Sequence, residues 1–124
     1  MPSIAILGAS ANRNKFGNKA VRAYLRQGWD VYPINLRERV IEGLKVYRSL
    51  AELPVPALDR VSVYLPPQIG KQVLPELLKK SIGEIWFNPG SADEELLEIA
   101  RELGLNVAVG CSLLDSGQDP SLLP

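Results

Sequence analysis

The chain of 124 residues predicts one domain, and its 46% of hydrophobic residues can bury a core without a disulfide or a structural metal. Fourteen Lys and Arg residues balance fourteen Asp and Glu residues, which argues against sequence-independent nucleic-acid binding but leaves a local basic patch open. The chain has no His, which excludes His-activated nucleophiles, phosphohistidine and imidazole metal ligands, so we expect a binding protein rather than an enzyme. One Cys, no signal peptide and no apolar run of about 18 residues predict a cytoplasmic protein that does not span a membrane.

The first third of the chain is typical of a strand, a loop, a helix and a second strand. Residues 3–7 form an apolar run that ends at Gly8, as in a buried strand of a parallel sheet. After a loop, apolar side chains recur at helical spacing from Ala20 to Leu25. Residues 29–34 form the second predicted strand, in which Pro33 has no N–H group and is expected near the end of the ladder.

The middle of the chain is less regular. Residues 41–47 are a candidate extended segment, and Ser49 and Glu52 have the spacing of a capping box, which predicts a short helical turn. Residues 60–65 form the third predicted strand. The helical pattern that follows contains Pro75, which predicts a kink or a helix whose regular part starts there.

The last third of the chain repeats the alternation. Residues 84–87 form the fourth predicted strand, and Ser91 and Glu94 form a second capping box, which predicts the start of a helix. Residues 105–109 form the fifth predicted strand. Residues 112–124 have neither helical nor strand periodicity.

This alternation predicts an α/β fold: a single doubly wound parallel sheet, Rossmann-like, with about five strands and helices on both faces. We expect the domain to cover residues 1–111 and residues 112–124 to form a C-terminal tail. In such sheets ligands bind beyond the carboxyl ends of the strands. This rule selects five segments rich in Gly, Pro, Asn and Ser: residues 8–17, 33–39, 66–67, 88–90 and 110–112.

The loop after the first strand is the most informative segment. Ala9 and Ser10 are small enough to let a phosphate approach the main chain, and the helix start that follows favours an anion. Ser10, Asn12 and Lys15 add side-chain donors. An ordinary turn also needs Gly8 and small residues, so a plain turn remains the alternative. The loop is not a Walker A motif, and it lacks the second and third Gly of the dinucleotide fingerprint.

The residues after the second strand argue against NAD. An NAD site usually has Asp or Glu here for the ribose hydroxyls, whereas this chain has Asn35, followed by Arg37 and Arg39. Arginine would attract a phosphorylated ribose, as in CoA or NADP, unless these side chains only solvate the loop.

The remaining segments allow two interpretations each. Pro66, Pro67 and the Asn88-Pro89-Gly90 turn line a narrow ligand arm, or they only end strands. Cys111 is interpreted as a small packed residue, with a thiol that faces the ligand as the alternative. Tyr64 is interpreted as a core residue.

The motif segments follow one another along nearly the whole chain: Ile6-Leu7-Gly8-Ala9-Ser10-Ala11-Asn12 with Lys15 and Gly17, Val31-Tyr32-Pro33-Ile34-Asn35, Gly43, Tyr47-Arg48-Ser49-Leu50, Leu53-Pro54, Leu65-Pro66-Pro67, Trp86-Phe87-Asn88-Pro89-Gly90 and Cys111. In this order they resemble the CoA-binding domain family of small stand-alone bacterial and archaeal proteins, and the nucleotide-binding part of the succinyl-CoA synthetase alpha subunit. The chain departs from the family pattern at Leu36-Arg37, where Pro-Lys is frequent, at Asn88, where Gln is usual, and at Gly110, where Arg is frequent. The phosphohistidine segment of the synthetase has no counterpart, so the resemblance does not imply ligase chemistry.

The resemblance implies that the loop over residues 8–17 holds the pyrophosphate of CoA, chiefly through Ser10 and Lys15. It implies that Asn35 and Arg37 lie near the adenosine, with Arg37 facing the 3′-phosphate, and that the prolines border the pantetheine arm. The candidate CoA-binding residues are therefore Gly8, Ala9, Ser10, Asn12, Lys15, Gly17, Pro33, Asn35, Arg37, Pro66, Pro67, Asn88, Pro89 and Gly90.

The leading hypothesis is non-catalytic binding of coenzyme A or acyl-CoA, by a sensor, a carrier or a subunit that acts with a partner enzyme. The first alternative is an NADP-linked oxidoreductase-type nucleotide-binding module, and the second is an interaction module whose cleft is vacant. The apolar residues of the tail also suggest a homodimer: Leu113, Leu114, Leu122 and Leu123. We expect no metal, nucleic-acid or membrane partner.

Overall fold

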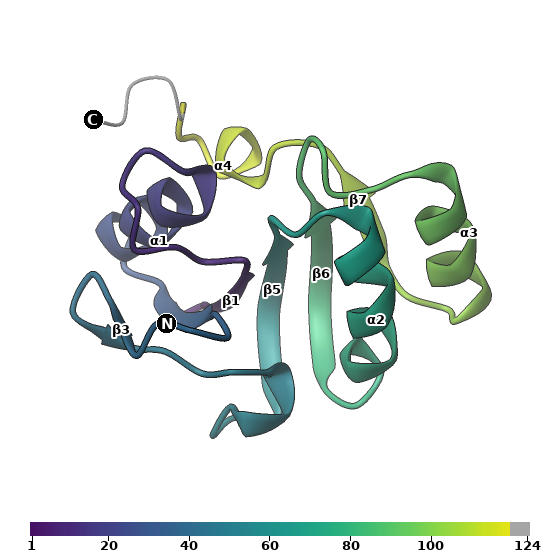
Figure 1. Ribbon diagram of the computed structural model, residues 1–124, viewed down its shortest axis with the longest axis horizontal. Coiled ribbons are helices and arrows are strands. Elements are labelled where there is room, and N and C mark those ends of the chain that lie inside the picture. The colour runs from purple at the N-terminus through teal and green to yellow at the C-terminus, as the bar shows by residue number, and fades with distance from the viewer. Residues whose placement is uncertain (120–124) are drawn as a thin grey trace.

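The computed structural model describes residues 1–119, and it has one parallel sheet between two layers of helices (Figure 1). The five strands, in spatial order β2-β1-β5-β6-β7, are Asp30–Ile34 (β2), Ser3–Leu7 (β1), Ala57–Val63 (β5), Ser81–Phe87 (β6) and Val107–Val109 (β7). The α-helices are Phe16–Arg26 (α1), Pro67–Leu77 (α2), Glu94–Glu102 (α3) and Ser112–Asp115 (α4). All neighbouring strands of this sheet are parallel, which confirms the predicted Rossmann-like α/β class.

Each face of the sheet has its own hydrophobic cluster. Helix α1 packs Val21 and Tyr24 against Ile4 and Ile6 of β1, and Leu113 of α4 joins the same cluster. Helices α2 and α3 pack on the other face, where the buried residues include Leu74, Leu77, Leu96, Ala100, Val61, Val63, Ile85 and Phe87. Figure 1 shows α1 and α4 together on one side of the sheet and α2 and α3 on the other. The carboxyl ends of the strands therefore lie between two helical layers.

The irregular connection from β2 to β5 contains the two features that the sequence indicates. The extended segment is a hairpin of Val40–Ile41 (β3) and Leu44–Lys45 (β4), and the capping-box turn is the 3-10 helix Leu50–Glu52 (η1). After the hairpin the chain returns along the outer edge of β2. There the Tyr47 amide donates to the Pro33 carbonyl at 3.0 Å, and the Asn35 amide donates to the Tyr47 carbonyl at 3.0 Å.

Two helices differ from their predicted form. Helix α3 begins at Glu94 because the Asp93 carboxylate, not Ser91, caps it by accepting from the Leu96 amide at 2.8 Å. The Ser91 hydroxyl instead donates to the Asn88 carbonyl at 2.7 Å. Helix α2 begins at its first proline and continues through Pro75, which is exposed in the last turn, where water can solvate the carbonyl that loses its partner.

Strands β5 and β6 each begin three residues earlier than predicted. Ala57 pairs with Ser81, and the two strands remain paired although Asp59 and Gly83 interrupt the apolar pattern. Asp59 belongs in this position because its carboxylate accepts from the Ser3 amide at 2.8 Å. Polar contacts across the sheet thus extend strands beyond their apolar stretches.

The segment predicted as a tail begins with helix α4. Leu113 is buried in the domain core, whereas Leu114 is 61% exposed. Leu122 and Leu123, the other residues of the suggested dimer contact, lie outside the described residues. Within residues 1–119 no helix is long and apolar enough to span a membrane.

Candidate functional site

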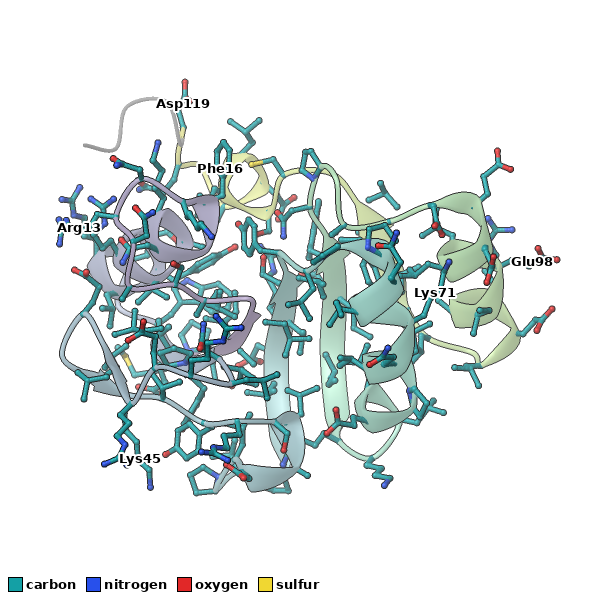
Figure 2. All side chains as sticks on the ribbon, viewed as in Figure 1. Arg13, Phe16, Lys45, Lys71, Glu98 and Asp119 are labelled. Atoms are coloured by element: carbon teal, nitrogen blue, oxygen red, sulfur yellow. The ribbon has the colours of Figure 1, made fainter. Side chains whose placement is uncertain are left out.

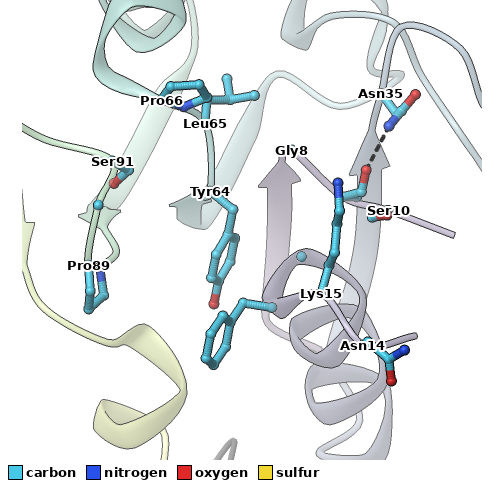
Figure 3. A pocket seen from close by; sticks show the side chains of 14 residues that line it. Gly8, Ser10, Asn14, Lys15, Asn35, Tyr64, Leu65, Pro66, Pro89 and Ser91 are labelled. Atoms are coloured by element: carbon cyan, nitrogen blue, oxygen red, sulfur yellow. Dashed lines mark hydrogen bonds between the residues drawn. The ribbon is translucent and has the colours of Figure 1, made fainter. Parts of the chain in front are cut away.

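A cleft of about 660 Å³ lies at the carboxyl ends of β1, β5 and β6. The chain leaves β1 toward β2 on one side and leaves β5 toward β6 on the other, so the cleft lies at the point where the strand order reverses. Figure 3 shows that the walls come from the loops after these three strands. The lining residues are Gly8, Ala9, Ser10, Asn14, Lys15, Phe16, Gly17, Asn35, Tyr64, Leu65, Pro66, Pro89, Gly90 and Ser91.

Two glycines bring the start of α1 against the loop after β1. A Cβ on Gly17 would overlap the carbonyl oxygen of Gly8. Gly8 itself has a φ of +84°, and a Cβ there would lie 2.8 Å from the Tyr64 carbonyl oxygen. Because neither glycine has a side chain, the backbone at the start of α1 lies directly at the cleft wall.

Within its own first turn, the start of α1 lacks the groups that usually offset the positive end of a helix dipole. Its N-cap residue, Lys15, makes no side-chain cap, and the first turn has no acidic residue. The amides of Phe16 and Gly17 have no acceptor within the helix, as in any first helical turn. Helix α3, by contrast, begins with the capping Asp93 and has acidic residues in its first turn. The helix dipole and the Lys15 ammonium therefore favour an anion at the cleft wall.

Asn35 connects the end of β2 to the loop after β1. Its side-chain amide donates to the Ala9 carbonyl at 2.8 Å, the bond drawn in Figure 3. Its side-chain oxygen accepts from the amides of Arg37 at 2.7 Å and Glu38 at 2.9 Å. The side chain thus orders both loops where they meet.

The polar side chains of the first loop also bond to the loop itself. The Ser10 hydroxyl accepts from the Asn12 amide at 3.0 Å, and the Asn12 side chain accepts from the Asn14 amide at 3.0 Å. The Lys15 amide donates to the Asn12 carbonyl at 3.0 Å. Two of the predicted donors therefore shape the loop, and Lys15 is left as the cation on this wall.

Tyr64 forms part of the opposite wall. Its hydroxyl oxygen is buried and has no hydrogen-bond partner of good geometry among residues 1–119. Burial raises the pKa of Tyr64 to about 12, although the nearby hydroxyls of Ser112 and Ser62 oppose the rise. The phenol therefore stays neutral across the physiological pH range.

Asn88 lies buried behind this wall. Its side-chain amide donates to the Ser62 hydroxyl at 2.8 Å and to the Val63 carbonyl at 2.9 Å, and its side-chain oxygen accepts from the Ser112 amide at 2.9 Å. The Ser62 and Ser112 hydroxyls are 2.7 Å apart. This network fixes the turn after β6, whose Pro89 and Gly90 reach the cleft.

A second cavity of about 610 Å³ adjoins the cleft, because Gly8, Asn35 and Leu65 line both. Its walls are mostly apolar, and the charged residues among them are Arg37, Arg48 and Glu76. Arg37 and Arg48 come from the loop after β2 and from the segment before η1. The two cavities thus place an anion-favouring helix start and two arginines along one continuous depression.

The structure brings most of the predicted site residues together. Nine line the cleft: Gly8, Ala9, Ser10, Lys15, Gly17, Asn35, Pro66, Pro89 and Gly90. Arg37 lines the second cavity. Four line neither cavity: Asn12 is exposed in its loop, Pro33 is buried in β2, Pro67 is the first residue of α2, and Asn88 is buried.

The sequence reasoning missed several wall residues. Asn14, Phe16, Tyr64, Leu65 and Ser91 also line the cleft. Asn14 and Phe16 lie within the segment 8–17 that was already selected as a ligand-binding loop. Tyr64 and Leu65 were assigned to the third predicted strand, but this strand ends at Val63, so both residues follow it directly. Within residues 1–119, no group of three or more acidic or Cys side chains could hold a metal ion.

Comparisons with known proteins identify relatives of the chain. Residues 2–116 match the family model described as CoA binding domain. The chain is 32% identical over 117 residues to the acetate–CoA ligase [ADP-forming] II alpha subunit of Pyrococcus furiosus, covering 84% of this chain. It spans a quarter of the length of that relative, 25%.

Solved structures share the fold. A conserved hypothetical protein from Pyrococcus furiosus superposes with a TM-score of 0.85 at 35% identity, covering 93% of this chain and 99% of that one. The dinucleotide-forming acetyl-coenzyme A synthetase 1 of Candidatus Korarchaeum cryptofilum, in complex with phosphate and ADP, superposes with a TM-score of 0.74 at 26% identity, covering 85% of this chain and 25% of that one. Since the family model covers nearly all of its length, the chain belongs to the CoA-binding domain family.

Proposed function

We propose that the chain binds CoA or an acyl-CoA in the cleft after β1 and does not itself make or break bonds in the ligand. The observation that carries the proposal is the start of α1, which has no cap and no acidic residue and presents Lys15 at the cleft wall. A pyrophosphate supplies the negative charge that this helix start lacks, through bonds from backbone amides and the Lys15 ammonium.

The two adjoining cavities accommodate a ligand that extends from this point in both directions. The adenosine occupies the second cavity, where Arg37 and Arg48 bring positive charge to a 3′-phosphate. The pantetheine arm runs the other way, along Pro66, Pro89 and Gly90. The apolar walls of the second cavity suit a purine base.

The enzyme relatives suggest how binding without catalysis would be used. The matched ligase subunit is about four times as long as the matched region, so its activity needs more than this domain. The chain contains no His that could serve as a nucleophile or a general base. We therefore propose that it presents CoA to a partner protein or domain that supplies the reactive groups.

The test is thermal unfolding of ligand-stripped protein with CoA, 3′-dephospho-CoA, NADP and NAD in parallel. A ligand at about 100 times its Kd adds about 2.7 kcal/mol of stability, which raises the Tm by several degrees. We expect the largest shift with CoA, a smaller one with 3′-dephospho-CoA because it lacks the phosphate for the arginines, and none with NAD.

Matched lysine variants locate the effect. Lys15→Ala should reduce the shift with CoA, whereas Lys79→Ala, at an exposed position just beyond α2, should leave it unchanged. A rise in Tm with NADP alone, or no rise in Tm with any of the four ligands, would contradict the proposal.

A further inference from the structure

Glu42 has an unusual backbone conformation. Among residues 1–119 it is the one residue other than glycine with a positive φ, at 48°. It stands at the first position of the two-residue turn of the β3–β4 hairpin, followed by Gly43 with a φ of 79°. Gly, Asn or Asp suits such a turn better than Glu. A residue held in a conformation that it disfavours points to a role for its side chain.

The Glu42 carboxylate contacts the loop and the helix that form the cleft wall. One oxygen lies 2.7 Å from the Arg13 guanidinium, and the other accepts from the Asn18 side-chain amide at 3.1 Å. The Glu42 side chain is 20% exposed. The hairpin is therefore bonded to a segment more than twenty residues earlier in the chain.

Asn18 and Arg22, which are buried neighbours on α1, extend these contacts to the loop backbone. Asn18 donates to the Ser10 carbonyl at 2.9 Å, and Arg22 donates to the Arg13 carbonyl at 2.9 Å. Arg22 also donates to the Asn18 side-chain oxygen at 2.7 Å. Neither Asn18 nor Arg22 lines the cleft, so these bonds direct two loop carbonyls away from the surface that an anion would approach.

We propose that Glu42 is a positioning residue for the anion-binding loop over residues 10–15 and acts on it through Asn18 and Arg13. The inference rests on the proposed function, because the loop is the part of the cleft assigned to the pyrophosphate. Glu42 fixes the orientation of the Asn18 amide, and that amide fixes the Ser10 carbonyl. Without Glu42 the loop samples conformations that cannot bind the anion, and the measured affinity falls by the fraction of time that it spends in them.

Two variants separate this role from the stability of the turn. Glu42→Asn suits the left-handed turn better but is too short to reach Arg13 and Asn18, so we expect CoA to bind about tenfold more weakly by calorimetry, with an unchanged or higher Tm. Glu42→Gln keeps the length and one oxygen acceptor, so it should recover most of the affinity. The control is Glu98→Gln on α3, which makes the same charge change at the far side of the molecule from Arg13 (Figure 2) and should leave the affinity unchanged.

Amide hydrogen exchange of the ligand-free proteins tests the same role without CoA. We expect the amides of residues 10–18 to exchange faster in Glu42→Asn than in wild type, with the amides of α3 unaffected. Unchanged affinity and unchanged exchange in Glu42→Asn would overturn the inference, as would equal losses of affinity in the Asn and Gln variants. If the wild-type protein does not bind CoA, the proposed function fails, and the hydrogen-exchange result alone decides whether Glu42 orders the loop.

Discussion

Gly17 illustrates how single residues set the geometry of the cleft. In an exposed helix Gly→Ala stabilises by about 1 kcal/mol, but here the added Cβ would collide with the Gly8 carbonyl. We expect Gly17→Ala to lose about 2 kcal/mol of unfolding free energy in urea denaturation, since the backbone must shift. Gly70→Ala on α2 is the matched control, because the nearest atom to its Cβ would be the end of the Leu96 side chain at 3.0 Å, and the nearest backbone atom would be the Ser91 carbonyl oxygen at 3.8 Å. Equal effects of the two variants would disprove the collision.

The Tyr64 hydroxyl gives a second prediction at this scale. The buried hydroxyl has no good partner, so Tyr64→Phe should leave the stability at neutral pH unchanged or slightly higher. The folded pKa of Tyr64, about 12, exceeds the ordinary value of 10.0, so above pH 10 the phenol ionises more readily in the unfolded chain than in the folded one. The unfolding free energy of wild type is therefore unaffected by this group below pH 10 and falls as the pH rises toward 12. Wild type should therefore lose about 2 kcal/mol more than Tyr64→Phe across this interval. Denaturation at a series of alkaline pH values measures the difference, and parallel curves would contradict it.

Among the elements, α3 depends on its cap. Bonds from the Leu96 amide and from Lys71 hold the pKa of Asp93 below its ordinary value. A lowered pKa means that the ionised group stabilises the fold above about pH 4, and that this contribution is lost as the pH falls through the folded pKa. Asp93→Asn keeps a cap acceptor but loses the charge, so its deficit in unfolding free energy should be larger at pH 7 than at pH 3. A deficit that is the same at both pH values would exclude the charge as the cause.

The elements also show what the sequence could and could not predict. Strands of a parallel sheet are buried on both faces, so residues 3–7 were recognisable as an apolar run. The first residues of β5 were not, because Asp59 is held there by a bond to β1. The capping box predicted at Ser91 was wrong, since the Ser91 hydroxyl donates to the Asn88 carbonyl and Asp93 caps α3.

In the candidate site, too, some residues could be predicted from the sequence and others could not. The loop at Gly8 could be predicted because the fold places ligands after strands and Gly permits its conformation. The place of Arg48 in the second cavity and the contact of Glu42 with Asn18 could not, because both depend on how the connection between β2 and β5 folds back on the domain. No periodicity links such distant residues, so only the folded chain reveals them.

Across the whole molecule, Arg60 joins elements that are far apart in the chain. Its buried guanidinium lies 2.7 Å from Glu84 of β6 and 2.8 Å from Asp115 of α4, and it donates to the Tyr24 hydroxyl of α1 at 3.3 Å. The rings of Trp29 and Trp86 lie 5.6 Å and 5.3 Å from it. One side chain on β5 thus contacts both neighbouring helices of its face and an adjacent strand.

The corresponding prediction concerns Arg60→Lys. An ammonium keeps the charge but cannot reach both carboxylates or stack between the rings, so we expect a loss of about 2 kcal/mol in unfolding free energy. The two tryptophans report this directly, and their fluorescence should change in the same transition as far-UV circular dichroism. The exposed Arg101→Lys on α3 is the control and should differ from wild type by less than about 0.5 kcal/mol. Similar losses of unfolding free energy in both variants would show that the contacts of Arg60 are not the cause.

Both edge strands of the sheet, β2 and β7, are poorly suited to pair with a strand of another chain. At the β2 edge the Tyr47 amide already donates to the Pro33 carbonyl, and Pro33 has no N–H group that could donate to another chain on the same side. The β7 margin has only three residues. Open margins with longer rows of unused backbone groups invite intermolecular strand pairing and aggregation. This fold therefore offers an incoming strand few backbone groups to pair with, and Pro33, near the end of β2, disfavours aggregation by strand pairing at this edge.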